Sequence, residues 1–154
     1  MSSDPVKFPF FPVPGGHIKR PLVWLYLENL HDPGGAGFRH PALVDTGADR
    51  SVVPRDLCKH LGHVFEAGTS PSTTGGIGSG RPKTIRHATR ITVLSPTDGS
   101  WMPGVDNAVF FPLEFQLSYI DQDLPFILLG QADFLNLFEF TQNRPEGWFS
   151  LRRL

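Results

Sequence analysis

Residues 42–54, with the sequence ALVDTGADRSVVP, place a carboxylate directly after a hydrophobic strand. The apolar residues Ala42–Val44 lead into Asp45, and Thr46 and Gly47 follow before apolar residues resume. An ionised carboxylate at the inner end of a strand costs free energy unless it is hydrogen-bonded or neutralised. The segment therefore indicates either a tight structural turn or a site where the charge takes part in chemistry.

Turn-forming residues are spread along the whole chain. The 154 residues include 16 glycines and 15 prolines, about a fifth of the total, which favours many short strands joined by turns. A short helix is predicted after Pro54, because Leu57 and Leu61 lie four residues apart and Gly62 can cap the end. This pattern predicts a mainly β fold, either a small barrel or a sandwich, with one or two short helices.

The predicted elements follow from apolar stretches between turn signals. The predicted strands are 21–30, 41–47, 84–94 and 124–130, with one or two short strands within 107–117. The predicted helical segments are 53–63 and 132–138, and the predicted closing hairpin turns around 143–147. Residues 1–20 form an extended arm rich in proline and phenylalanine, which is excluded from a central strand because proline lacks an amide donor. The remainder, 21–154, is predicted to be a single domain, because no repeat or linker interrupts it.

Charge and cysteine content exclude several classes of function. The net charge is −1 and no long basic run occurs, so neither nucleic acid nor an anionic membrane surface is an expected partner. Cys58 is the only cysteine, which rules out a disulfide within the chain and fits a reducing compartment. No secretory signal or membrane-spanning apolar run is found, so we expect a soluble cytoplasmic protein.

Three ordered motifs carry a family resemblance. The sequence Asp-Thr-Gly-Ala begins at Asp45, the segment FILLG at 126–130 is followed by ADFL at 132–135, and GGIG lies between them at 75–78. Together these motifs resemble the active-site loop, the apolar segment beneath it and the flap tip of retropepsin-like aspartic proteases, most closely the bacterial members. The resemblance spans roughly residues 40–136 and implies a small closed acid-protease barrel that acts as an aspartic endopeptidase.

The resemblance also implies a set of site residues and an assembly. Only one Asp-Thr-Gly occurs in the chain, so the second carboxylate of the catalytic pair is expected from another copy in a homodimer. A peptide or protein is the implied substrate, and neither a cofactor nor a metal is implied. The implied catalytic residues are Asp45, Thr46 and Gly47, and the implied substrate-binding residues are Gly47, Ala48, Asp49, Gly76, Ile77 and Gly78.

The sequence departs from the family pattern after the LLG segment. Gln131 stands where the family often has an arginine, which in retroviral relatives pairs with the acid corresponding to Asp49 and supports the dimer; one extra residue also precedes the DFL segment. This departure leaves room for a second hypothesis, a catalytically inactive module of the same fold that binds extended peptides.

Plainer interpretations apply to each motif. Asp45 can simply cap an Asx turn, and the loop around 75–78 can be an ordinary glycine-rich connection. A phosphate-binding loop is excluded, because neither dinucleotide nor P-loop spacing is met. Cys58, His60 and His63 cluster in sequence, but no fourth ligand accompanies them, so a structural zinc site is not expected.

Overall fold

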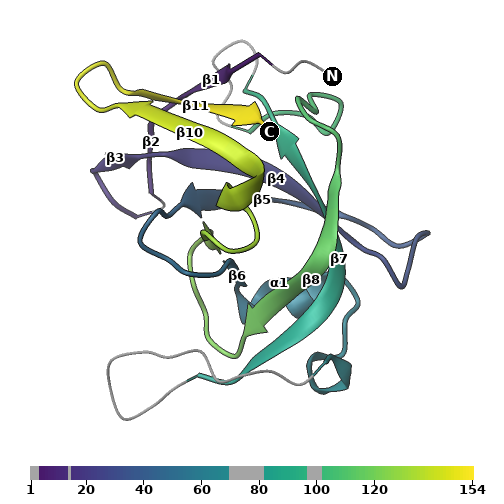
Figure 1. Cartoon of the computed structure of the whole chain (residues 1–154). Coiled ribbons are helices and arrows are strands. Elements are labelled where there is room, and N and C mark those ends of the chain that lie inside the picture. The colour runs from purple at the N-terminus through teal and green to yellow at the C-terminus, as the bar shows by residue number, and fades with distance from the viewer. Residues whose placement is uncertain (1–3, 14, 70–81, 97–101) are drawn as a thin grey trace.

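The structure is a computed structural model of the whole chain, and it describes residues 4–13, 15–69, 82–96 and 102–154. Strands dominate the described residues, with one short α-helix and two 3₁₀ turns (Figure 1). The elements in chain order are β1 (Val6–Pro9), β2 (Phe11–Pro12), β3 (Lys19–Arg20), β4 (Leu22–Asn29), β5 (Phe38–Val44), β6 (Val52–Val53), α1 (Arg55–His60), η1 (Phe65–Ala67), β7 (Thr84–Leu94), β8 (Leu113–Ile120), β9 (Ile127–Leu129), η2 (Leu135–Leu137), β10 (Phe138–Asn143) and β11 (Trp148–Arg153).

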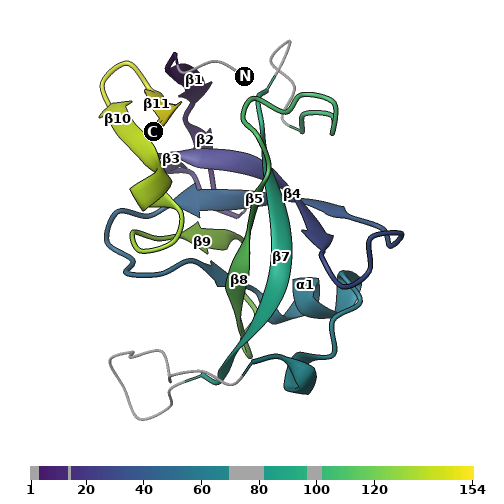
Figure 2. The ribbon, with the colours of Figure 1, turned by 45° about the vertical axis from the view of Figure 1, so that its right-hand side comes forward.

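Six strands close into a barrel in the order β4-β5-β9-β6-β8-β7, with β7 returning to pair with β4. The longest ladder joins β7 to β8, from the pair Thr84–Ile120 to the pair Ile91–Leu113. Two pairings are parallel, β5 with β9 and β6 with β8, and β6 meets β9 antiparallel between them. Segments far apart in sequence therefore lie side by side at the end of β5 (Figure 2).

The barrel interior is filled by alternating side chains from its strands. Leu25, Leu27, Ile91 and Ile127 are fully buried, as is Tyr119 on β8. The Tyr119 hydroxyl lies 2.8 Å from Oγ1 of Thr89, so the buried polar atom has a hydrogen-bond partner. The predicted strand 84–94 coincides with β7, because branched and apolar residues predominate in it between two turn-rich segments.

A second sheet lies at one end of the barrel, opposite α1 (Figure 1). Its order is β1-β11-β10, so the proline-bearing β1 occupies an edge, as the sequence led us to expect. The Phe8 ring from β1 stacks on Phe149 from β11, with centroids 5.0 Å apart, and both side chains belong to the hydrophobic core. The N-terminal arm therefore contributes core contacts as well as strand pairing.

The helical predictions differ from the structure in length. The helix predicted over 53–63 spans only Arg55–His60, because Pro54 keeps an extended backbone and Gly62 adopts a positive φ of 78° just after the end. The predicted helical turn at 132–138 is a 3₁₀ turn at Leu135–Leu137. No helix among the described residues has the length and apolar character of a membrane span.

The segment 107–117, in which one or two short strands are predicted, is regular strand only in its second half. The regular strand β8 begins only at Leu113, directly after Pro112, and runs on to Ile120. The preceding residues form a single bridge between Ala108 and Leu94. Proline cannot donate to a strand ladder, which explains why regular pairing starts after it.

Candidate active site

Asp45 is the first residue beyond the end of β5. Its backbone N–H donates to the carbonyl of Leu129 at 2.9 Å, continuing the parallel pairing of β5 with β9 by one residue. The side chain is half-buried, whereas Val44 before it is buried in the core. The strand therefore delivers a carboxylate to the boundary between the core and an open loop.

The loop that follows holds one oxygen of this carboxylate. The Gly47 N–H donates to Oδ1 of Asp45 at 2.9 Å, and the Ala48 N–H donates to the Asp45 carbonyl at 3.1 Å. A Cβ atom at position 47 would lie 3.3 Å from the same Oδ1, which is tighter than ordinary van der Waals contact. Glycine at this position thus lets a backbone donor approach the carboxylate closely.

The other predicted residues of this loop lie on its outer side. Thr46, Gly47 and Asp49 are exposed, and Ala48 is half-buried. Asp45, Thr46, Gly47, Ala48 and Asp49 are therefore brought together on one short loop. The predicted flap residues Gly76, Ile77 and Gly78 lie outside the described residues.

The segment after β9 supports the loop of Asp45 through hydrogen bonds to its backbone carbonyls. The Gln131 N–H donates to the Ala48 carbonyl at 2.9 Å, and the Ala132 N–H donates to the Asp49 carbonyl at 2.8 Å. The Gln131 side chain also donates from Nε2 to the Thr46 carbonyl at 2.7 Å. Gln131 therefore binds the backbone of the loop that follows Asp45 in its own chain.

Sequence reasoning missed a polar pair that connects these two segments. The Asp133 carboxylate accepts hydrogen bonds from the Ser51 hydroxyl at 2.6 Å and from the Ser51 N–H at 3.0 Å. The Ser51 Oγ in turn accepts from the Gly130 N–H at 3.0 Å, and Ser51 is fully buried. The sequence does contain a signal for this pair: Ser51 directly precedes two valines, which predicts that its hydroxyl is buried and needs a hydrogen-bond partner.

Gly130 allows the two segments to approach this closely. A Cβ atom at this position would collide with the backbone of Arg50. The close approach explains, in physical terms, why the apolar segment ends on a glycine.

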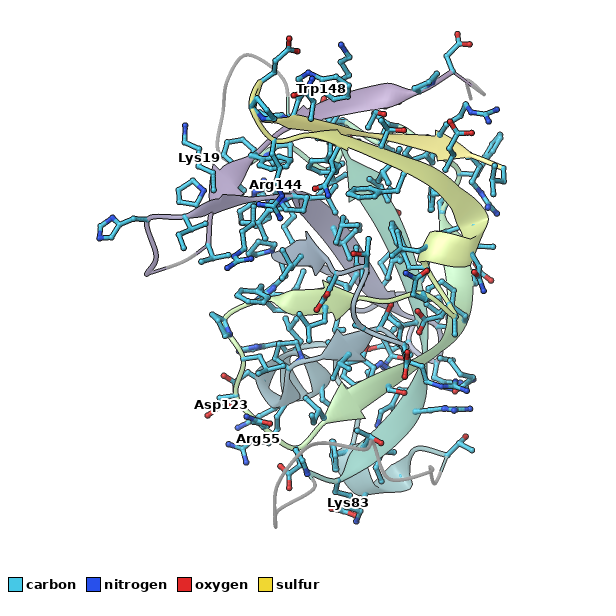
Figure 3. The ribbon with its side chains drawn as sticks, turned by 60° about the vertical axis from the view of Figure 1, so that its left-hand side comes forward. Lys19, Arg55, Lys83, Asp123, Arg144 and Trp148 are labelled. Atoms are coloured by element: carbon cyan, nitrogen blue, oxygen red, sulfur yellow. The ribbon has the colours of Figure 1, made fainter. Side chains whose placement is uncertain are left out.

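A hollow of about 110 Å³ opens beside Asp45. Its lining comes from β3, from the end of β5 and from the β10–β11 hairpin, and it includes Arg20, Asp45, Thr46, Phe140, Gln142 and Arg144. Figure 3 shows Arg144 between β3, which carries Lys19, and β11, which carries Trp148. The carboxylate of the loop therefore borders an accessible space with strongly polar walls.

The candidate metal ligands Cys58, His60 and His63, in and just after α1, do not gather around a common point. The exposed His60 ring tilts against Phe38 with centroids 5.1 Å apart, whereas Cys58 is buried and its Sγ donates to the His63 carbonyl at 3.9 Å. Burial raises the pKa of the Cys58 thiol to about 11, which keeps it protonated near neutral pH. Within the described part of the chain, no group of three metal-binding side chains comes together.

Two buried histidines stack on one another beyond α1. The rings of His63 and His87 have centroids 4.5 Å apart, and Tyr119 meets both edge-on at 5.3 Å. Burial lowers the pKa of His63 to about 4, with a further contribution from neighbouring His87, and burial also lowers the pKa of His87. The His87 Nε2 donates to the Phe65 carbonyl at 3.2 Å, so this pair joins η1 to the barrel.

Comparisons with known proteins give the fold. A retropepsin-like aspartic protease from Rickettsia conorii aligns with a TM-score of 0.53 and 16% identity, over 97% of this chain and 92% of that chain. The retroviral protease-like domain of Ddi1 from Leishmania major aligns with a TM-score of 0.50 and 14% identity, over 87% of this chain and 94% of that chain. No protein-family model and no curated protein matches the sequence. This chain therefore has a retropepsin-like fold, and the mainly β closed barrel expected from its motifs is confirmed.

Proposed function

We propose that this protein is an aspartic endopeptidase that hydrolyses peptide bonds of extended polypeptides. The observation that carries the proposal is the position of Asp45 in a retropepsin-like fold. Its carboxylate lies at the end of a core strand, is held by the Gly47 N–H at 2.9 Å, and borders an open hollow. A turn-capping aspartate explains the hydrogen bond, but it does not require the hollow or the supporting segment after β9.

The proposed chemistry uses two carboxylates and one water. Two aspartates in close contact cannot both ionise, so the pair shares a single proton. The ionised carboxylate takes a proton from the water as the water oxygen adds to the carbonyl carbon of the scissile bond, and the protonated carboxyl gives its proton to the carbonyl oxygen. The first carboxyl then gives its proton to the amide nitrogen as the C–N bond breaks, and the second takes a proton back from the diol, which restores the single shared proton. The reaction needs no covalent intermediate with the protein.

The second carboxylate is proposed to come from a second copy of the chain. The sequence contains one Asp-Thr-Gly, and a two-fold axis beside Asp45 would pair that residue with its own counterpart. Thr46 is exposed at the rim of the loop, which leaves its side chain accessible to the other subunit. Because Gln131 binds the carbonyl of Thr46, it would position this loop within one subunit and would not bridge the two.

The proposed substrate lies extended across the loop. Gly47 and Asp49 follow Asp45 at exposed positions, where backbone groups can bind a peptide in strand-like fashion, and Ala48 lies between them with its N–H and its carbonyl hydrogen-bonded within the protein. The glycine-rich residues Gly76–Gly78 remain the proposed flap on sequence grounds.

The deciding experiment compares wild-type protein with Asp45→Asn on a mixed peptide library, between mildly acidic and neutral pH. We expect the wild type to cleave peptides and the variant to lose cleavage while its unfolding curve stays unchanged. Asp106→Asn, an exposed aspartate in the connection from β7 to β8, serves as the matched control and should cleave normally. Peptide binding without cleavage in the dimeric wild type would favour the inactive binding module instead.

A further inference from the structure

The hollow beside Asp45 carries more positive than negative charge. Arg20 from β3 and Arg144 from the turn between β10 and β11 both line it, and Asp45 is the one acid among the described residues of the lining. Among the described residues, neither arginine forms an ion pair; the Arg144 guanidinium lies 6.0 Å above the Phe10 ring instead. Two guanidinium groups are therefore available to a ligand at this position.

The rest of the lining favours the same ligand chemistry. Gln142 and Thr46 add an amide and a hydroxyl that can donate hydrogen bonds, and Phe140 adds an apolar wall. A guanidinium group matches a carboxylate in plane and can bind both oxygens. The volume of about 110 Å³ suits one side chain or chain end, since whole-ligand pockets begin at about 300 Å³.

We propose that this hollow selects substrates that carry a carboxylate close to the scissile bond. The carboxylate comes from an aspartate or glutamate side chain or from the free C-terminus of a short peptide. The inference rests on the proposed endopeptidase function. Within each hollow two guanidinium groups face a single carboxylate, and the sharing of one proton between the two Asp45 side chains of the proposed dimer lowers that negative charge further. The uncompensated positive charge favours an acidic substrate over its neutral isostere.

The test uses quenched peptides built on a sequence that the wild type cleaves. Glutamate, glutamine and leucine are placed in turn at each position around the scissile bond, and each peptide is made with a free or an amidated C-terminus. We expect glutamate to exceed glutamine in kcat/KM by about tenfold or more at one position, the scale of one charge-assisted hydrogen bond. If only the free C-terminus gives this gain, the carboxylate recognised is the chain end.

The arginines are tested by Arg20→Gln and Arg144→Gln, with Lys19→Gln as the matched control. Lys19 is the exposed neighbour of Arg20 on β3, and it does not line the hollow. We expect each arginine variant to bring the ratio of glutamate to glutamine close to one and the control to leave it unchanged. Arg144→Glu should reverse the preference, because it inverts the charge at an exposed position of the lining.

Two further measurements separate this inference from the proposed function. Binding of fluorescein-labelled glutamate and glutamine peptides to Asp45→Asn tests the hollow without cleavage, so a glutamate preference there supports the inference even if no protein form is catalytic. The competing possibility is that a carboxylate of the second protein copy occupies the hollow. Sedimentation tests it by measuring whether the arginine variants still form the dimer. The inference would be overturned if the dimer dissociates in the arginine variants while the glutamate-to-glutamine ratio stays unchanged. It would also be overturned if the wild type cleaves and binds both peptides equally.

Discussion

Ser51 and Asp133 show how one pair of side chains connects the loop of Asp45 to the segment after β9. The Ser51 N–H and hydroxyl both donate to the Asp133 carboxylate, which also accepts from the Phe134 N–H at 2.8 Å. The two residues lie 82 positions apart in the chain. Because Ser51 is fully buried, loss of either partner leaves polar atoms without a hydrogen bond away from water.

Ser51→Ala is expected to lower the free energy of unfolding by about 1–3 kcal/mol, the usual cost of an unsatisfied buried group. Urea unfolding of Ser51→Ala, Asp133→Ala and the double variant measures this effect. The double variant should lose less than the sum of the two single losses, because both changes remove the same interaction. Strictly additive losses would show that the pair does not act as a unit.

At the scale of elements, the short helix and the barrel meet around the stacked histidines. His63 follows α1, His87 lies on β7, and η1 is joined to the barrel through the hydrogen bond from His87 to Phe65. Both rings are buried and both pKa values are lowered, chiefly by that burial. The contact between these elements therefore depends on neutral imidazoles.

Acidification is expected to weaken this contact. The folded-state pKa of His63 is about 4, below the ordinary value of 6.5, so the unfolded chain takes up the proton more readily. The stability from the neutral ring is complete above about pH 6.5 and declines as the pH falls from 6.5 toward 4. The expected loss is about 1–3 kcal/mol over this window.

The measurement is the unfolding free energy as a function of pH for the wild type and for His63→Phe, which keeps an aromatic ring in contact with Tyr119. The variant should lose less stability between pH 6.5 and 4 than the wild type, because it has no group to protonate there. Parallel curves for the two proteins would assign the acid sensitivity to other groups.

At the scale of the molecule, the barrel and the three-stranded sheet enclose the hollow beside Asp45 from two sides. Residues of β3 and the β5 end meet residues of β10 and its turn in one lining. The proposed dimer would join two such molecules next to this hollow, since each chain supplies one aspartate. Catalysis is then a property of the assembly, and a single subunit holds only half of the site.

Specific activity should therefore fall when the protein is diluted below the dissociation constant of the dimer. Peptide cleavage measured over a dilution series, beside sedimentation of the same samples, tests this dependence. Cleavage is expected to track the dimer fraction. Full activity from a demonstrated monomer would contradict the shared aspartate pair.

Several features followed from local sequence alone. The bounds of β7, the short helix after Pro54 and the closing hairpin depend on apolar runs, proline and glycine, which act on their immediate neighbours in the chain. The motif around Asp45 carries its own turn geometry, because the Gly47 N–H reaches a carboxylate only two residues away. Such short-range interactions can be recognised in a sequence.

Other features exist only because the barrel closes. The strand β6 has two residues, too few for any periodicity, and pairing with β8 and β9 defines it. Ser51 meets Asp133, and Arg20 meets Arg144 around one hollow, across long stretches of intervening chain. No local pattern encodes these encounters, because they depend on which strands pair and in which register. The sequence thus determined the motif around Asp45, while tertiary pairing decided which segments support it and the charge of the space beside it.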